Sequence, residues 1–192
     1  TKDNKDLVDD TYINPDEDDW GFVGGMDETV VVDERQLPEN TAKSALNCGF
    51  VGVGGGGGKL AKAFLDLGFN KTLLVNTTEK DQPGGVDPQH FLQIPGTDGV
   101  GKDVNLGKKV LSDNSAMVED ALRSRLGKVD WVFVLAGGGG GTGSASHALH
   151  GACERYLKSI ESDGGVVYIV TKPSAQELLN PAIEENFNSL LN

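Results

Sequence analysis

Two runs of five glycines are the residues of this sequence with the clearest chemical use. They are Gly54–Gly58, in "FVGVGGGGGKLAKAF", and Gly137–Gly141, in "VFVLAGGGGGTGSASHAL". A glycine inside a regular element costs about 0.5–1 kcal/mol relative to alanine, so such runs need a compensating use. Without side chains, the partly positive amides at a helix N-terminus can approach a phosphate closely. Two such runs predict a site for a di- or triphosphate.

Each glycine run lies between an apolar segment and a helix-like segment. The pattern predicts strands over 48–53, 72–76, 129–136 and 165–170, with a possible further strand at 89–94. It predicts helices over 59–68, 108–126, 144–157 and 176–191, with a loop at 54–58. Apolar strands that alternate with helices indicate an α/β fold, a Rossmann-like, mostly parallel sheet with helices on both faces. Ligands bind such sheets at the carboxyl ends of the strands, where both runs fall.

Other uses of the glycines are tight packing of a helix on the sheet, a Walker loop and a dinucleotide loop. One run alone would fit packing equally well; two similar runs favour phosphate binding. The Walker pattern fails because Val53 and Leu60 stand where glycine and Ser or Thr are required. Gly52, Gly54 and Gly57 fit the dinucleotide pattern, but Asn76 ends the second strand where a ribose-binding acid is expected.

The charge of the chain is concentrated near its start. The net charge is −12 over 192 residues, and residues 1–46 hold thirteen acidic but only four basic side chains. This composition predicts a solvated acidic arm, or a docking segment for a protein partner, followed by one domain over 47–192. The arm would repel nucleic acid, and no later basic patch attracts it. No apolar run approaches the length of a bilayer span. With two cysteines and no secretory signal, a cytoplasmic protein is expected.

The second run, continued as "GGGGGTGSA", resembles the signature loop of the tubulin/FtsZ superfamily. Other segments resemble FtsZ loops in the same order: "VGVGGGGGKLA" the first phosphate loop, "LVNTTEKDQ" the Asn-Thr-Asp loop, "GVGKDVNLG" a third glycine loop and "YIVTKP" the strand before the sugar loop. The likeness covers residues 47 to about 190. It implies a GTP-binding domain of a cytoskeletal protein that forms head-to-tail filaments, with GTP or GDP and Mg²⁺ at the subunit interface.

The resemblance also implies which residues bind the nucleotide. Those matched to the first phosphate loop are Gly54, Gly55, Gly56, Gly57, Gly58 and Lys59, followed by Thr77 and Thr78. Those matched to the γ-phosphate loop are Val100, Gly101 and Lys102, and those matched to the signature loop are Gly138, Gly139, Gly140, Gly141, Thr142, Gly143 and Ser144. Glu177 matches a ribose-contacting glutamate, or is an ordinary acid at a helix start.

Several positions depart from the family pattern. Lys59 replaces an asparagine, Thr78 replaces an aspartate near the magnesium with Glu79 the only acid beside it, and Pro181 replaces a guanine-side arginine. The metal ligands therefore stay unassigned. His147 and His150 are expected to be ordinary helix residues, because no third metal ligand is evident.

The sequence ends at Asn192, before the family's central helix and the loop with its catalytic acid. Slow GTP hydrolysis by this chain alone is therefore expected. Two alternatives stay open: a structural relative that does not hydrolyse GTP, and an NAD-dependent Rossmann oxidoreductase. The biological role of a filament, whether cell division, plasmid segregation or phage DNA positioning, does not follow from the sequence.

Overall fold

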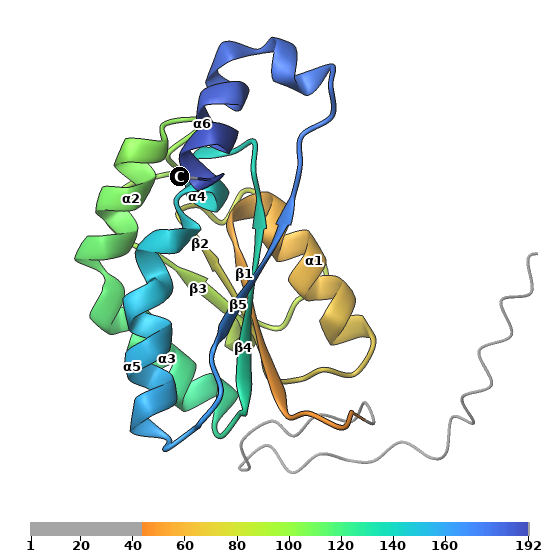
Figure 1. Ribbon diagram of the computed structural model, residues 1–192, viewed down its shortest axis with the longest axis vertical. Coiled ribbons are helices and arrows are strands. Elements are labelled where there is room, and N and C mark those ends of the chain that lie inside the picture. Colours follow the sequence, from red (N-terminus) through yellow and green to blue (C-terminus); the bar gives the residue numbers. More distant parts are fainter. Residues whose placement is uncertain (1–43, 192) are drawn as a thin grey trace, which may run out of the picture. The chain divides into compact units, whose positions relative to one another are not determined.

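The computed structural model describes residues 44–191, and the arm predicted for 1–46 lies almost entirely outside them. Five parallel strands form one sheet in the order β3-β2-β1-β4-β5. The strands are β1 (Cys48–Val53), β2 (Thr72–Asn76), β3 (Phe91–Gln93), β4 (Trp131–Gly137) and β5 (Val166–Thr171). Every strand pair is parallel, so all five carboxyl ends lie along one edge, as the sequence predicts (Figure 1).

Within residues 44–191, six α-helices connect and cover the strands (Figure 1). They are α1 (Gly54–Asp66), α2 (Val104–Asp113), α3 (Ser115–Leu126), α4 (Gly141–Ser144), α5 (His150–Ser159) and α6 (Pro181–Leu191). Short 3₁₀ turns precede β3, α5 and α6, over Pro88–His90, Ser146–Leu149 and Glu177–Leu179. The α/β class with helices on both faces is thereby confirmed.

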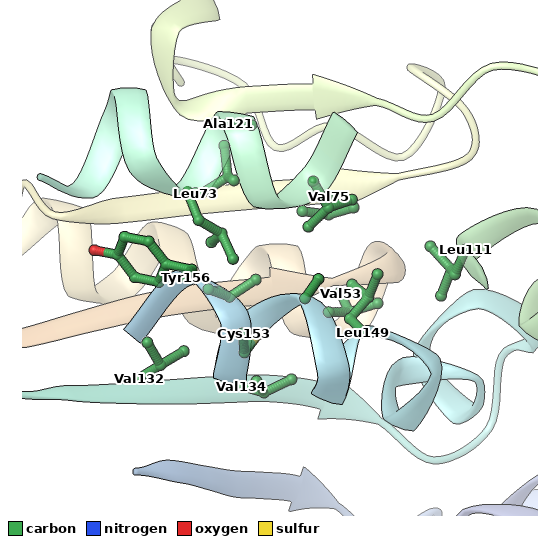
Figure 2. Close-up of a cluster of buried hydrophobic side chains, with 14 of the residues drawn as sticks. Val53, Leu73, Val75, Leu111, Ala121, Val132, Val134, Leu149, Cys153 and Tyr156 are labelled. Carbon is green, nitrogen blue, oxygen red and sulfur yellow. The ribbon is translucent and has the colours of Figure 1, made fainter. Parts of the chain in front are cut away.

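The larger hydrophobic core lies between the sheet and helices α2, α3 and α5. Its strand side chains, such as Val53, Leu73 and Val134, are fully buried. Figure 2 shows Cys153 and Tyr156 among them. The Tyr156 hydroxyl donates a hydrogen bond to the Gly127 carbonyl at 2.7 Å, so the one polar atom of this large side chain is satisfied.

Helix α1 covers the other face of the sheet. There Phe50 stacks on Phe64 of α1 with ring centroids 4.0 Å apart, and Phe133 of β4 stacks on Phe50 from the neighbouring strand. The contact between α1 and the strands is unusually close, because a Cβ at Gly52 would lie 2.6 Å from Cβ of Ala61. Within the first glycine run, Gly57 is required for the same packing, because a Cβ there would overlap the Leu135 carbonyl oxygen.

The helix boundaries differ from the sequence predictions in four places. The helix expected over 176–191 is a 3₁₀ turn, Glu177–Leu179, followed by α6, which begins only at Pro181. Residues 54–58 are the first turn of α1 and not a loop. The helix expected over 108–126 is two helices that meet at Asn114, whose side-chain amide donates to the Val110 carbonyl. The helix expected over 144–157 is divided among α4, a 3₁₀ turn and α5.

Among residues 44–191, no helix is both long and apolar enough to span a bilayer. The two cysteines, Cys48 and Cys153, are buried and not joined by a disulfide.

Candidate nucleotide site

A cavity of about 430 Å³ lies at the carboxyl edge of the sheet. Its walls come from the segments that follow β1, β2, β3, β4 and β5, together with α6. The residues that line it are Gly54, Gly55, Gly56, Asn76, Thr77, Thr78, Asp81, Gly99, Val100, Gly101, Gly137, Gly138, Gly139, Gly140, Gly141, Thr142, Gly143, Thr171, Lys172, Pro173, Glu177 and Ile183. Segments far apart in the sequence therefore meet where the parallel sheet predicts a ligand.

The first glycine run divides into two functional halves. Gly54, Gly55 and Gly56 line the cavity, and Gly54 adopts a φ of +71° that favours glycine. Gly57 instead faces β4, where a Cβ would overlap the carbonyl oxygen of Leu135, and Gly58 faces Leu74. The N-terminal amides of α1 thus open onto the cavity, while Gly57 and Gly58 pack on the sheet.

The second glycine run forms the opposite wall. Gly137 ends β4, and α4 begins at Gly141. The Gly141 amide donates to the Gly101 carbonyl at 3.0 Å, which joins this wall to the loop 99–103. A Cβ at Gly56 would lie 3.2 Å from Cα of Gly137, so the two glycine runs approach each other closely.

Two threonine hydroxyls meet inside the site. Oγ1 of Thr77 and Oγ1 of Thr142 are 2.9 Å apart and both side chains are buried. One hydroxyl donates its proton to the other, which leaves one proton for an acceptor in the cavity. The pair can therefore still offer a hydrogen bond to a phosphate oxygen.

Charged groups around the cavity are few. Lys172 supplies one cation, and Asp81 and Glu177 supply two carboxylates. Positive potential for an anion must therefore come mainly from backbone amides and from the N-terminus of α1, which has thirteen residues.

Glu177 is held in place by Ser174. The Ser174 backbone amide and hydroxyl donate to Oε2 of Glu177 at 2.8 and 2.7 Å. These hydrogen bonds, the backbone one first, lower the pKa of the Glu177 carboxyl below its ordinary value. Glu177 therefore stays ionised at neutral pH, with its carboxylate fixed at the rim of the cavity.

We expect Ser174→Ala to raise the pKa of Glu177 toward its ordinary value, since the hydroxyl bond is lost while the backbone bond remains. A carboxyl with a lowered folded-state pKa stabilises the fold above its unfolded pKa, and this contribution is lost as pH falls through the folded value. Carbon-detected NMR titration of the Glu177 side chain between pH 2 and 7 measures the change. An unchanged titration midpoint in the variant would contradict the assignment.

Some residues predicted from the sequence lie outside the cavity wall. Gly57, Gly58, Lys102 and Ser144 do not line it, and Lys59 lies in an adjoining hollow with Lys80, Asp81, Gln82 and Pro83. Roles for these residues in binding stay predictions.

Several lining residues escaped the sequence analysis. Thr171 could have been found, because it ends β5 at the ligand edge, but Ile183 and Asp81 enter through tertiary packing. Asn76 is buried, and its Oδ1 accepts a hydrogen bond from the Thr77 amide. This side chain therefore stabilises the start of the loop that follows β2.

A metal ion would find few protein ligands in this site. Within the described part of the chain, no three His, Cys, Asp or Glu side chains are grouped to hold one. Mg²⁺ is commonly held by one or two carboxylates and by substrate phosphates. Asp81 is a lining carboxylate beside Gly55, whereas Glu79 does not line the cavity, so the donor set fits a phosphate-bound Mg²⁺.

An all-parallel α/β sheet with glycine-rich loops at its carboxyl edge defines the general class of this domain. No family model matches the chain. Solved structures do: CetZ from Methanosaeta thermophila strain DSM 6194 has a TM-score of 0.62 and 25% identity. CetZ2 and CetZ1 from Haloferax volcanii have TM-scores of 0.63 and 0.64, with identities of 29% and 23%.

These matches cover 76% of this chain in each case, and 41%, 45% and 47% of the three solved chains in the order named. TubZ and FtsZ structures match as well. All are members of the tubulin/FtsZ superfamily, so the resemblance predicted from the sequence is confirmed, and the described domain has the fold of that superfamily. The chain spans less than half the length of these structures.

Proposed function

We propose that this chain is a GTP-binding domain of a cytoskeletal protein that assembles head to tail, with the nucleotide at the subunit interface. The observation that carries the proposal is that the first glycine run, the loop 99–103 and the second glycine run line one cavity. Glycines from three segments line it and leave their backbone accessible, and this suits a chain of phosphates better than a single anion.

The matched structures support guanine nucleotide as the ligand. The CetZ2 structure is a GTPγS-bound protofilament, and the CetZ1 structure is a GDP-bound monomer. In our assignment, amides of Gly54–Gly56 and of Gly139 and Gly140 bind the α- and β-phosphates, because the Gly138 and Gly141 amides already donate to the Thr171 and Gly101 carbonyls. Gly99–Gly101 face the terminal phosphate. Glu177 contacts the ribose.

Mg²⁺ belongs to the same proposal. Asp81 and the Thr77–Thr142 hydroxyl pair would hold it or its bound water molecules against the phosphates. When bound, the metal neutralises phosphate charge; the residues of this chain orient the phosphates and exclude water around them.

Self-association completes the proposal. Repeated heterologous contacts that do not close produce a filament. A nucleotide lying between consecutive subunits would couple assembly to its phosphorylation state. The acidic segment 1–46, as a docking arm for another protein, is a separate part of the proposal.

We expect GTP and GDP, with Mg²⁺, to raise the melting temperature of the full chain. A ligand at one hundred times its Kd stabilises by about 2.7 kcal/mol. For a domain of this size that corresponds to a shift of about 5–10 °C. ATP and NAD should give smaller shifts. A rise with NAD and none with GTP or GDP would support the oxidoreductase alternative and overturn the proposal.

A further inference from the structure

A buried asparagine of α6 joins two walls of the cavity. Asn186 is 2% exposed, and its Nδ2 donates to the Lys102 carbonyl at 2.9 Å. The same amide nitrogen reaches the Gly139 carbonyl at 3.4 Å, a longer and weaker contact. One side chain thus bridges the loop 99–103 and the second glycine run, 37 positions apart at these two carbonyls.

The side-chain contacts of the loop 99–103 lie mainly at its two ends. The Thr97 hydroxyl donates to the Gly99 carbonyl at 2.8 Å, Val100 is buried, and Oδ1 of Asp103 accepts from the Leu106 amide at 2.9 Å. Gly99 and Gly101 have φ angles of +96° and +55°, and a Cβ at Gly101 would meet no atom within 4 Å. A backbone bond from Gly141 to Gly101 ties this loop to the second glycine run. The Asn186 amide adds a second tether, one residue further along at Lys102.

Helix α6 is well anchored for this role. A Cβ at Gly138 would lie 3.1 Å from Cε2 of Phe187, so the α6 side chain rests directly on the second glycine run. Helix α2 also holds α6, because Nζ of Lys108 donates to Oγ of Ser189 at 2.8 Å. Asn186 is therefore presented by a helix fixed at both sides.

We propose that Asn186 is a positioning residue that holds the loop 99–103 against the second glycine run and thereby sets the preference for a nucleoside triphosphate over a diphosphate. This inference rests on the proposed function, in which that loop faces the terminal phosphate. In that assignment the two glycine runs bind a diphosphate, so the loop 99–103 contributes little to diphosphate affinity. A triphosphate gains affinity only where the loop is already in place, since ordering it on binding would cost free energy.

The test uses the full chain with Mg²⁺ and two ligands, GTPγS and GDP, titrated by calorimetry. Asn186→Leu and Asn186→Ala both remove the side-chain amide. The leucine side chain has nearly the volume of asparagine, and the alanine side chain is smaller. Asn186→Gln retains an amide. Glu185→Leu places the same apolar side chain at an exposed position of the same helix and is the control.

We expect both variants that lack the amide to bind GTPγS roughly tenfold more weakly, the usual effect of one lost buried hydrogen bond. GDP affinity should change less than threefold, the Gln variant should recover part of the loss, and the control should match the original chain. Equal losses for both ligands, or no loss for either, would overturn the inference.

Amide hydrogen exchange without nucleotide separates this inference from the proposed function. Losing the tether should speed exchange at Gly101, Lys102 and Asp103 while β1 and β4 stay protected. If the original chain binds neither ligand, the proposed function fails and the nucleotide preference fails with it. The exchange measurement then still decides whether Asn186 positions the loop, and unchanged exchange would overturn that too.

Discussion

Gly140→Val is expected to weaken GTP and GDP binding at least about a hundredfold while leaving the melting temperature of the free chain within a few degrees. Gly140 lines the cavity, and a Cβ there would meet no protein atom within 4 Å. Its φ of −99° and ψ of 160° suit a β-branched residue. The new side chain therefore fits the fold but occupies space beside the amides that the phosphates need.

The size of this effect follows from lost hydrogen bonds to a charged group. Each contributes about 1.5–3 kcal/mol, so keeping a phosphate away from two amides costs about 3–6 kcal/mol. Calorimetry with GDP measures the change. Gly84→Val is the matched control, since its Cβ also meets nothing within 4 Å and Gly84 does not line the cavity. Undiminished binding by the Gly140 variant would remove the second glycine run from the phosphate site.

Gly57→Ala is expected to destabilise the fold by about 4 kcal/mol or more, or to prevent folding. The added Cβ would overlap the Leu135 carbonyl oxygen and lie 3.0 Å from the Leu135 carbonyl carbon. Leu135 belongs to β4, which pairs with strands on both sides, so its backbone cannot shift without disturbing the sheet. Effects this large arise where overpacking has no route of relief.

Gly58→Ala, one residue along the same helix, is the control for that experiment. Its Cβ would make an ordinary contact, 3.5 Å from Cδ2 of Leu74. Alanine is the better helix former by about 0.5–1 kcal/mol, so this variant should melt at the same temperature or slightly higher. Thermal unfolding followed by circular dichroism compares the two. Similar melting curves would mean that α1 does not approach β4 as closely as described.

The contrast between Gly57 and Gly58 shows what the sequence could and could not predict. Continuous apolar runs identify β1, β2 and β4, because a strand buried on both faces requires them. The edge strand β5 has an apolar run as well, although its side chains are partly exposed. The same sequence pattern predicts that the five glycines of residues 54–58 form one loop. Contact with β4 overrides the low helix propensity of glycine and makes 54–58 the first turn of α1.

The boundary at Asn114 has a local cause. The apolar spacing continues across it, so periodicity predicts one helix. The Asn114 side chain instead bonds the Val110 carbonyl, a local hydrogen bond that competes with helix continuation.

The candidate site was predictable where it depends on the backbone. Runs of glycine directly after apolar strands identify two parts of the site, Gly54–Gly56 and the second glycine run. Asp81 and Asn186 are not, because each reaches the site through a tertiary approach, beside Gly55 in one case and across two loops in the other.

Glycine-selective ¹⁵N NMR is the most direct test of the central claim, that guanine nucleotide binds among the glycine loops. GDP with Mg²⁺ should shift the amide signals of Gly54–Gly56 and Gly138–Gly141. Distant glycines such as Gly68 and Gly151, which do not line the cavity, should be unaffected. Shifts confined to glycines outside the cavity, or none at millimolar GDP, would contradict the account.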